Sequence, residues 1–334
     1  MNDKGQKTGH IFGPVPSRRL GRSLGIDLVP HKTCTYDCLY CQVGHTTEKT
    51  AARKNWVDVD EIIAELETKL SSPVRDKASE MPDGRQGRPA SNGTSRPDYI
   101  TLSGSGEPTL FAGCGELIEK IKKITDVPVA VITNGSMLSE KQVRKELLGA
   151  DLVAPSLDAG DEETFQKINQ PCSEITFDRM LAGLIEFRRE FKGKYWLEVF
   201  FIDGLNDGGE QVDKIASCIA AIGPDKVQLN TVTRPPADDV GPVSRQRLEQ
   251  IAKKLGPNAE VIADFKGDEQ ESGFKIKDAD IIEMLKRRPC SLEDIAAGLK
   301  TPIIEAMKHI EVLIKSGKIE AVRQNEKVYY KAVS

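Results

Sequence analysis

Three cysteines, Cys34, Cys38 and Cys41, lie in one short CxxxCxxC run. Soft thiolate ligands select iron–sulfur chemistry, and short spacers let a single loop wrap around a cluster. Three thiolates would hold three irons of a [4Fe-4S] cluster and leave the fourth iron without a protein ligand from this run. A zinc knuckle with His31 or His45 as the fourth ligand is the alternative. Because zinc sites more often pair their cysteines as CxxC, the spacing favours the cluster.

With Tyr40 directly before its last cysteine, the run resembles the signature of the radical SAM superfamily. The resemblance implies that the three cysteines hold a [4Fe-4S] cluster whose open iron chelates S-adenosyl-L-methionine, and that Tyr40 borders this cofactor. It also implies reductive cleavage of S-adenosylmethionine to a 5′-deoxyadenosyl radical, which abstracts hydrogen from a substrate. An external electron donor of the flavodoxin or ferredoxin type would supply the electron.

The elements that must position this run alternate between β-like runs and amphipathic helical stretches. Such alternation predicts parallel strands joined by right-handed crossovers. Periodicity alone does not separate a doubly wound sheet from a barrel. The resemblance favours an α/β fold with a partial (β/α)6 TIM-like barrel, in which function gathers at the C-terminal strand ends. The expected strands are 24–29, 99–102, 129–132, 152–157, 196–201 and 226–230, and the expected helices are 59–70, 115–124, 139–147, 177–191, 209–222 and 243–255.

The pattern divides the chain into two domains. Residues 1–270 are the expected catalytic barrel, interrupted at 71–98 by a stretch rich in Pro, Gly, Ser and Arg that predicts a flexible insertion. Residues 275–334 predict three short helices and a hairpin, which resembles a winged helix-turn-helix. This domain has 12 Lys and Arg against 9 Asp and Glu, a balance too even for a dedicated DNA reader. Docking of RNA, of a peptide or of a second subunit therefore stays open.

Polar and glycine-rich residues follow the later strands. The run Ser-Gly-Ser-Gly-Glu at 103–107 looks like the radical SAM Gly-Gly-Glu element, which contacts the amino group of the methionine moiety, with Ser105 replacing the first glycine. An Asx turn is the alternative reason for Thr133 and Asn134. Ser156 and Asp158 alternate along a strand and would share one side. The predicted cofactor-binding residues are Tyr40, Gly104, Ser105, Gly106, Glu107, Thr133, Asn134, Ser156, Asp158, Asn206 and Asn230.

Arginines near the first strand indicate a site for an anionic substrate. Arg18, Arg19 and Arg22 could grip phosphates, with a surface salt-bridge cluster as the alternative, and Arg234 could hold a carboxylate or a phosphate. Together with 12–27, the strand ends look like the branch related to the tRNA wyosine-base synthase, over roughly residues 11–240. That synthase carries a second cysteine set upstream of the triplet. Here no cysteine precedes Cys34, which argues against the wyosine ring-forming step.

Composition sets the remaining expectations. The net charge of −4 gives no general attraction to nucleic acid, and no apolar run approaches the ~18–20 residues of a membrane span. Seven cysteines in 334 residues, three of them in one loop, do not resemble a disulfide framework, so we expect a cytoplasmic protein without a membrane partner. We predict a radical SAM enzyme whose substrate is a tRNA base. Modification of a protein or peptide, and a metal- or redox-sensing DNA-binding regulator, are the alternatives.

Overall fold

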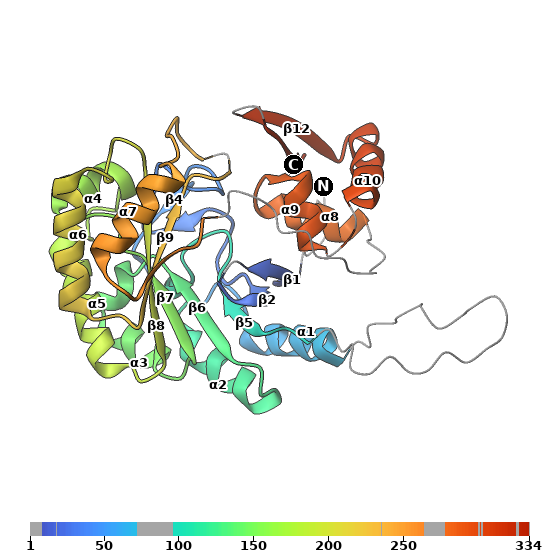
Figure 1. Ribbon diagram of the computed structural model, residues 1–334. Coiled ribbons are helices and arrows are strands. Elements are labelled where there is room, and N and C mark those ends of the chain that lie inside the picture. Colours follow the sequence, from blue (N-terminus) through green and yellow to red (C-terminus); the bar gives the residue numbers. More distant parts are fainter. Residues whose placement is uncertain are drawn as a thin grey trace.

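The computed structural model describes residues 9–17, 19–71, 96–234, 236–263, 278–299, 301, 303–324 and 327–333. One large sheet dominates the fold, with strand order β1-β2-β5-β6-β7-β8-β9-β10 (Figure 1). Its strands are β1 (Ile11–Ser17), β2 (Gly21–Ile26), β5 (Tyr99–Leu102), β6 (Val129–Thr133), β7 (Leu152–Pro155), β8 (Lys194–Phe201), β9 (Lys226–Thr231) and β10 (Ala259–Val261). A separate two-stranded sheet pairs β3 (Thr33–Cys34) with β4 (Glu48–Lys49).

Every neighbouring pair from β2 to β10 is parallel, whereas β1 pairs with β2 in the antiparallel sense. Parallel strands need a crossover between them, and helices supply it here, which confirms the predicted α/β fold with a partial TIM-like barrel. The helices of this part are α1 (Val59–Ser71), α2 (Cys114–Ile124), α3 (Lys141–Leu147), α4 (Glu162–Asn169), α5 (Phe177–Glu190), α6 (Gly209–Ile222) and α7 (Arg245–Leu255), with 3-10 turns η1 (Pro108–Leu110) and η2 (Ser136–Ser139).

Several elements differ from the sequence prediction. The antiparallel edge strand β1, the short edge strand β10 and helix α4 were not predicted. Strand β2 lies three residues earlier than expected, and β7 ends at Pro155 instead of continuing to residue 157. The helix predicted over 139–147 begins two residues later, at Lys141, and a 3-10 turn over 136–139 precedes it. Gly135, the N-cap of that turn, has a φ of 81° that favours glycine.

The main core lies between the sheet and its helices. Buried strand residues such as Val131 and Leu197 share one cluster with helix residues such as Ile118 and Leu184. Strand β7 is buried along its whole length, as expected for a parallel strand covered on both faces. Burial on this scale fixes the strand ends, and with them the loops that carry the functional side chains.

The C-terminal part has a core of its own, formed by Ile281, Leu285, Ile295, Ile310 and Leu313 among others. Its elements are α8 (Asp278–Arg287), β11 (Cys290–Ser291), α9 (Leu292–Gly298), α10 (Ile303–Lys315), β12 (Ile319–Gln324) and β13 (Lys327–Ala332), with sheet order β11-β13-β12. The predicted helices and hairpin are present, and the winged-helix assignment stays a prediction. This unit lies beside β1 (Figure 1), where α8 and α9 contact that strand. Most of the predicted insertion at 71–98 is outside the described residues.

Candidate functional site

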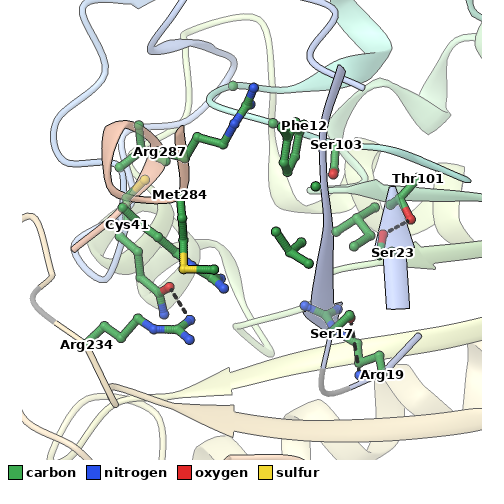
Figure 2. A pocket seen from close by; sticks show the side chains of 18 of the residues that line it. Phe12, Ser17, Arg19, Ser23, Cys41, Thr101, Ser103, Arg234, Met284 and Arg287 are labelled. Atoms are coloured by element: carbon green, nitrogen blue, oxygen red, sulfur yellow. Dashed lines mark hydrogen bonds between the residues drawn. The ribbon is translucent and has the colours of Figure 1, made fainter. Parts of the chain in front are cut away.

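A cavity of about 700 Å3 brings the cysteine run together with the C-terminal ends of the parallel strands. Thr133 at the end of β6, Ser156 after β7 and Asn230 in β9 border it, as function at the strand ends of a barrel requires. Figure 2 shows Cys41 and Arg234 on one side of this cavity and Ser23 and Thr101 on the other. Residues that are far apart in the sequence therefore share one chamber.

All three predicted cluster ligands line this cavity as free thiols. Cys34 ends β3, and the backbone N–H of Cys41 donates to the carbonyl of Cys38 at 3.0 Å, so the run turns tightly. Two asparagine side chains donate to sulfur: Asn134 Nδ2 to Cys34 Sγ and Asn169 Nδ2 to Cys38 Sγ, each at 3.5 Å. Donors of this kind stabilise negative charge on thiolate ligands.

The chemistry of this donor set suits an iron–sulfur cluster. Burial, with a contribution from Glu107, raises the pKa of the Cys34 thiol to about 12, and burial also raises the pKa of Cys38 and Cys41, so a bound cation is needed to hold them as thiolates. Within the described ranges no three His, Cys, Asp or Glu side chains are grouped to hold a single metal ion. Ligands of a cluster bind different irons and need not converge on one point. His45, a zinc candidate, instead contacts Asp37 at 3.3 Å.

Glu107 borders the cavity but is buried, and its carboxylate binds neighbouring protein groups. Oε1 accepts from the hydroxyls of Thr109 at 2.5 Å and Thr133 at 2.6 Å and from the Thr109 N–H at 3.0 Å, while Oε2 accepts from the Asn134 N–H at 2.7 Å. Burial raises the pKa of Glu107, although these hydrogen bonds oppose the shift. The residue thus ties the glycine-rich loop to the end of β6.

The two glycines of this loop let its backbone lie close to neighbouring groups of the protein. A Cβ atom added to Gly106 would lie 2.1 Å from the carbonyl oxygen of Thr33, and one on Gly104 would lie 2.2 Å from Asp27 Oδ1. Both glycines line the cavity, whereas Ser105 is not among the lining residues. The Ser105 hydroxyl instead donates to Asp27 Oδ2 at 2.7 Å. Ser105 therefore helps to hold the glycine-rich loop in place through its contact with Asp27.

Tyr40 lines the cavity, and two buried side chains fix its position. Its hydroxyl donates to Asp158 Oδ2 at 2.5 Å, and its ring stacks on Phe200 with centroids 4.0 Å apart. Asn169 Nδ2 donates to the same Asp158 oxygen at 2.8 Å. Burial raises the pKa of Asp158 to about 6. Asp158 is thereby connected to Tyr40 directly and to Cys38 through Asn169.

Asp158 and Asn206, which we predicted to contact the cofactor, are not among the residues that line the cavity. Because β7 ends at Pro155, the strand alternation that would pair Asp158 with Ser156 does not extend that far. Asn206 is fully buried, and its amide donates to the carbonyl oxygens of Asp158 and Phe200 at 2.7 and 2.8 Å. Both side chains bind backbone groups of Phe200, near the C-terminal end of β8.

The predicted substrate arginines reach the cavity where they are described. Arg19, Arg22 and Arg234 line it, and Arg18 lies outside the described residues. Arg19 forms an ion pair with Glu198 at 2.9 Å, and Arg234 forms one with Asp294 at 3.2 Å. Arg19 thus forms a salt bridge and also lines the cavity, and Arg234, predicted to hold a carboxylate or a phosphate, pairs with a carboxylate of the protein itself.

Sequence reasoning missed part of the lining altogether. These residues come from β1, from β8 and from the C-terminal unit: Phe12, Glu198, Asp280, Glu283, Met284, Arg287, Arg288 and Leu299. The helical pattern of 278–288 predicted α8 but carried no signal of the surface that the helix faces. Only the packing of α8 beside β1 places it at the chamber.

Residues 92–217 match the family model described as Radical SAM superfamily. The chain is therefore a radical SAM enzyme, a class whose members bind a [4Fe-4S] cluster and S-adenosylmethionine. Within this class it belongs to the UPF0026 family: it is 31% identical over 327 residues to the UPF0026 protein MJ1312 of Methanocaldococcus jannaschii, covering 96% of this chain and 94% of that protein. The model match begins after the cysteine run, so the ligand assignment depends on the cysteine spacing and the cavity.

Other similar proteins are matched over a smaller share of their own length or at lower sequence identity. A Brachyspira hyodysenteriae protein named GTPase Obg is 42% identical over 317 residues, which is 94% of this chain but only 44% of that protein. The S-adenosyl-L-methionine-dependent tRNA 4-demethylwyosine synthase of Pyrococcus abyssi is 24% identical over 177 residues, 52% of this chain and 50% of that protein. A solved radical SAM methyltransferase from Sphaerobacter thermophilus is 16% identical with a TM-score of 0.49, covering 84% of this chain and 70% of that one.

Among the described residues, no helix is both long enough and apolar enough to cross a membrane.

Proposed function

We propose that Cys34, Cys38 and Cys41 hold the [4Fe-4S] cluster and that S-adenosylmethionine and a substrate meet in the 700 Å3 cavity that these cysteines line. The observation that carries this proposal is the shared chamber: the triplet, the glycine-rich loop and five arginines of the described residues border the same space. Cluster and S-adenosylmethionine, when bound and reduced, supply a 5′-deoxyadenosyl radical that abstracts hydrogen. An electron donor of the flavodoxin or ferredoxin type and a cytoplasmic location belong to the same proposal.

The residues of the chain then have distinct roles. Asn134 and Asn169 donate N–H groups to two of the sulfurs and stabilise their charge. Gly104 and Gly106 let backbone groups approach the cofactor, and the polar side chains of Ser156 and Asn230 are available to its polar groups. Stacking on Phe200 keeps the Tyr40 ring from turning, so one wall of the chamber is preorganised.

For the substrate we propose a nucleic acid, with a tRNA base as the reacting group. Arg19, Arg22 and Arg234 at the cavity favour an anionic partner. The similarity to a protein named as a tRNA 4-demethylwyosine synthase, over about half of each chain, supports the same class. A peptide or protein substrate presented through the C-terminal unit is the competing proposal.

Anaerobic purification and reconstitution test the chemistry. We expect a brown protein with about four irons that forms 5′-deoxyadenosine from S-adenosylmethionine on reduction. Cys34→Ala should lose the intact cluster and all cleavage, whereas Cys218→Ala, a buried thiol of α6 away from the cavity, should keep both. A colourless zinc protein, or full activity in Cys34→Ala, would overturn the proposal. Mass spectrometry of tRNA and of the proteome from a deletion strain would then decide between the two substrate classes.

A further inference from the structure

The C-terminal unit closes one side of the cavity and is bound to the barrel by polar contacts. Arg287 Nη1 of α8 pairs with Asp27 Oδ2 at 3.0 Å, and Tyr329 of β13 donates its hydroxyl to the carbonyl oxygen of Thr233 at 2.8 Å. Arg234, in the loop after β9, pairs with Asp294 of α9 at 3.2 Å. The residues that line the cavity therefore come from both the barrel and the C-terminal unit, and the two units contact each other at the cavity.

Two arginines, Arg234 and Arg288, line the cavity where the two units meet, and Asp294 pairs with the first of them. Arg234 is 8% exposed, and it contacts Asp294 only at 3.2 and 3.4 Å and Gln42 Oε1 at 3.3 Å. These distances exceed the roughly 2.7–2.9 Å of a strong charge-assisted hydrogen bond. Such contacts leave room for a better acceptor to replace them.

Arg288 is the second arginine. It follows α8 directly, lines the cavity and makes no ion pair with any carboxylate in the described part of the chain. Burial and the neighbouring charge of Arg234 lower the pKa of Arg288, while Asp294 and Cys290 oppose this shift. Arginine nevertheless stays protonated in proteins, so a second positive charge faces the chamber.

Arg234 and Arg288 have fewer carboxylate partners than positive charges in the described part of the chain. Asp294 serves both arginines and also accepts the backbone N–H of Ser291 at 3.1 Å within the capping box of α9. Glu283 and Asp280 of α8 also line the cavity, and Glu283 opposes the burial that lowers the pKa of Arg287. In the described part of the chain, Arg234 and Arg288 together have one ion-pair partner, Asp294, so this pair of guanidinium groups is suited to accept a singly charged oxyanion.

We propose that Arg234 and Arg288 together bind a phosphodiester group of the substrate where the barrel and the C-terminal unit meet. The proposal rests on the proposed function in that it takes this cavity as the substrate site. It gives the C-terminal unit a direct part in substrate binding. A substrate without such an anion would leave the two charges unpaired and would bind weakly.

Titration calorimetry on the anaerobically purified full-length protein tests the site, with dimethyl phosphate and acetate as probes of the two anion classes. We expect Arg288→Ala to weaken binding of dimethyl phosphate by at least about tenfold, and Arg288→Lys to weaken it less. Asp294→Asn should tighten binding, because it removes the competing carboxylate while its side-chain oxygen still caps α9. Arg245→Ala is the matched control, since Arg245 is exposed on α7 and pairs with Glu249.

The opposite direction expected for Asp294→Asn separates a lost binding site from a folding defect, which would weaken every variant. Tighter binding of dimethyl phosphate than of acetate supports a phosphodiester site, and tighter binding of acetate overturns it in favour of a peptide carboxylate. Wild-type protein that binds neither anion, or Arg288→Ala that matches Arg245→Ala, overturns the proposal. The titration does not require cleavage of S-adenosylmethionine, so a protein that binds the anion but never forms 5′-deoxyadenosine refutes the proposed function instead.

Discussion

Asp27 connects the glycine-rich cofactor loop to helix α8, and its replacement tests whether this helix helps to position that loop. Asp27 Oδ2 accepts from the Ser105 hydroxyl at 2.7 Å and pairs with Arg287 Nη1 at 3.0 Å, and the Ser105 N–H lies 3.3 Å from Oδ1. Arg287 also lies 3.4 Å from the centre of the Phe12 ring. The Asp27 carboxylate thus joins the glycine-rich loop to α8, and both of these border the cavity.

Asp27→Ala should remove these contacts and leave Arg287 without its partner. A net hydrogen bond contributes about 0.5–1.5 kcal/mol, and a charged one about 1.5–3 kcal/mol. The side chains of the ion pair are 22% and 17% exposed, so solvent reduces its share, and we expect the free energy of unfolding to fall by about 2–3 kcal/mol. If about half of this energy holds the loop in its binding conformation, affinity for S-adenosylmethionine should fall about tenfold.

Denaturant unfolding, calorimetric titration of S-adenosylmethionine and iron analysis measure these effects, and the iron content should not change. Asp27→Asn keeps one acceptor oxygen and should fall between the wild type and Asp27→Ala. Asp60→Ala is the control, because Asp60 pairs with Lys120 but its side chain is 82% exposed. If Asp27→Ala lost stability yet bound S-adenosylmethionine like the wild type, Asp27 would support the fold without positioning the loop.

Three further predictions concern the buried groups around the cysteines. Glu107→Gln cannot satisfy the four donors that now surround the carboxylate. Affinity for S-adenosylmethionine should therefore fall roughly 5- to 150-fold, with iron retained. Glu119→Gln, at an exposed position, is the control and should match the wild type. Asn134→Ala removes an N–H donor from Cys34 Sγ and should make the reduction potential of the cluster more negative in an EPR redox titration; an unchanged potential would count against that hydrogen bond. Burial raises the pKa of Asp158 from 3.8 to about 6, so the folded state binds this proton more tightly than the unfolded chain does. The free energy of unfolding should therefore fall as the pH rises from about 4 to about 6. Denaturant unfolding at a series of pH values should show a smaller slope in Asp158→Asn.

The sequence by itself determined the chemistry and the class of fold. The cysteine spacing with Tyr40 predicted the cluster ligands, and these side chains all line one cavity. Alternating apolar runs and amphipathic stretches predicted a parallel sheet with helical crossovers, which the strand pairing confirms. Local patterns suffice for these features, because thiolate spacing and hydrophobic periodicity each act over a few residues.

Only the tertiary structure decided which polar residues reach the chamber. Asp158 and Asn206 were predicted as cofactor contacts, and the structure shows them buried and not among the residues that line the cavity. Arg287 and Arg288 looked like ordinary basic residues at a helix C-terminus. Their place at the cavity follows from the docking of α8 against β1, a contact between segments more than 250 residues apart, as the Asp27–Arg287 pair also is with a separation of 260 residues. No local pattern encodes such a contact, since it depends on how two separately formed cores fit together.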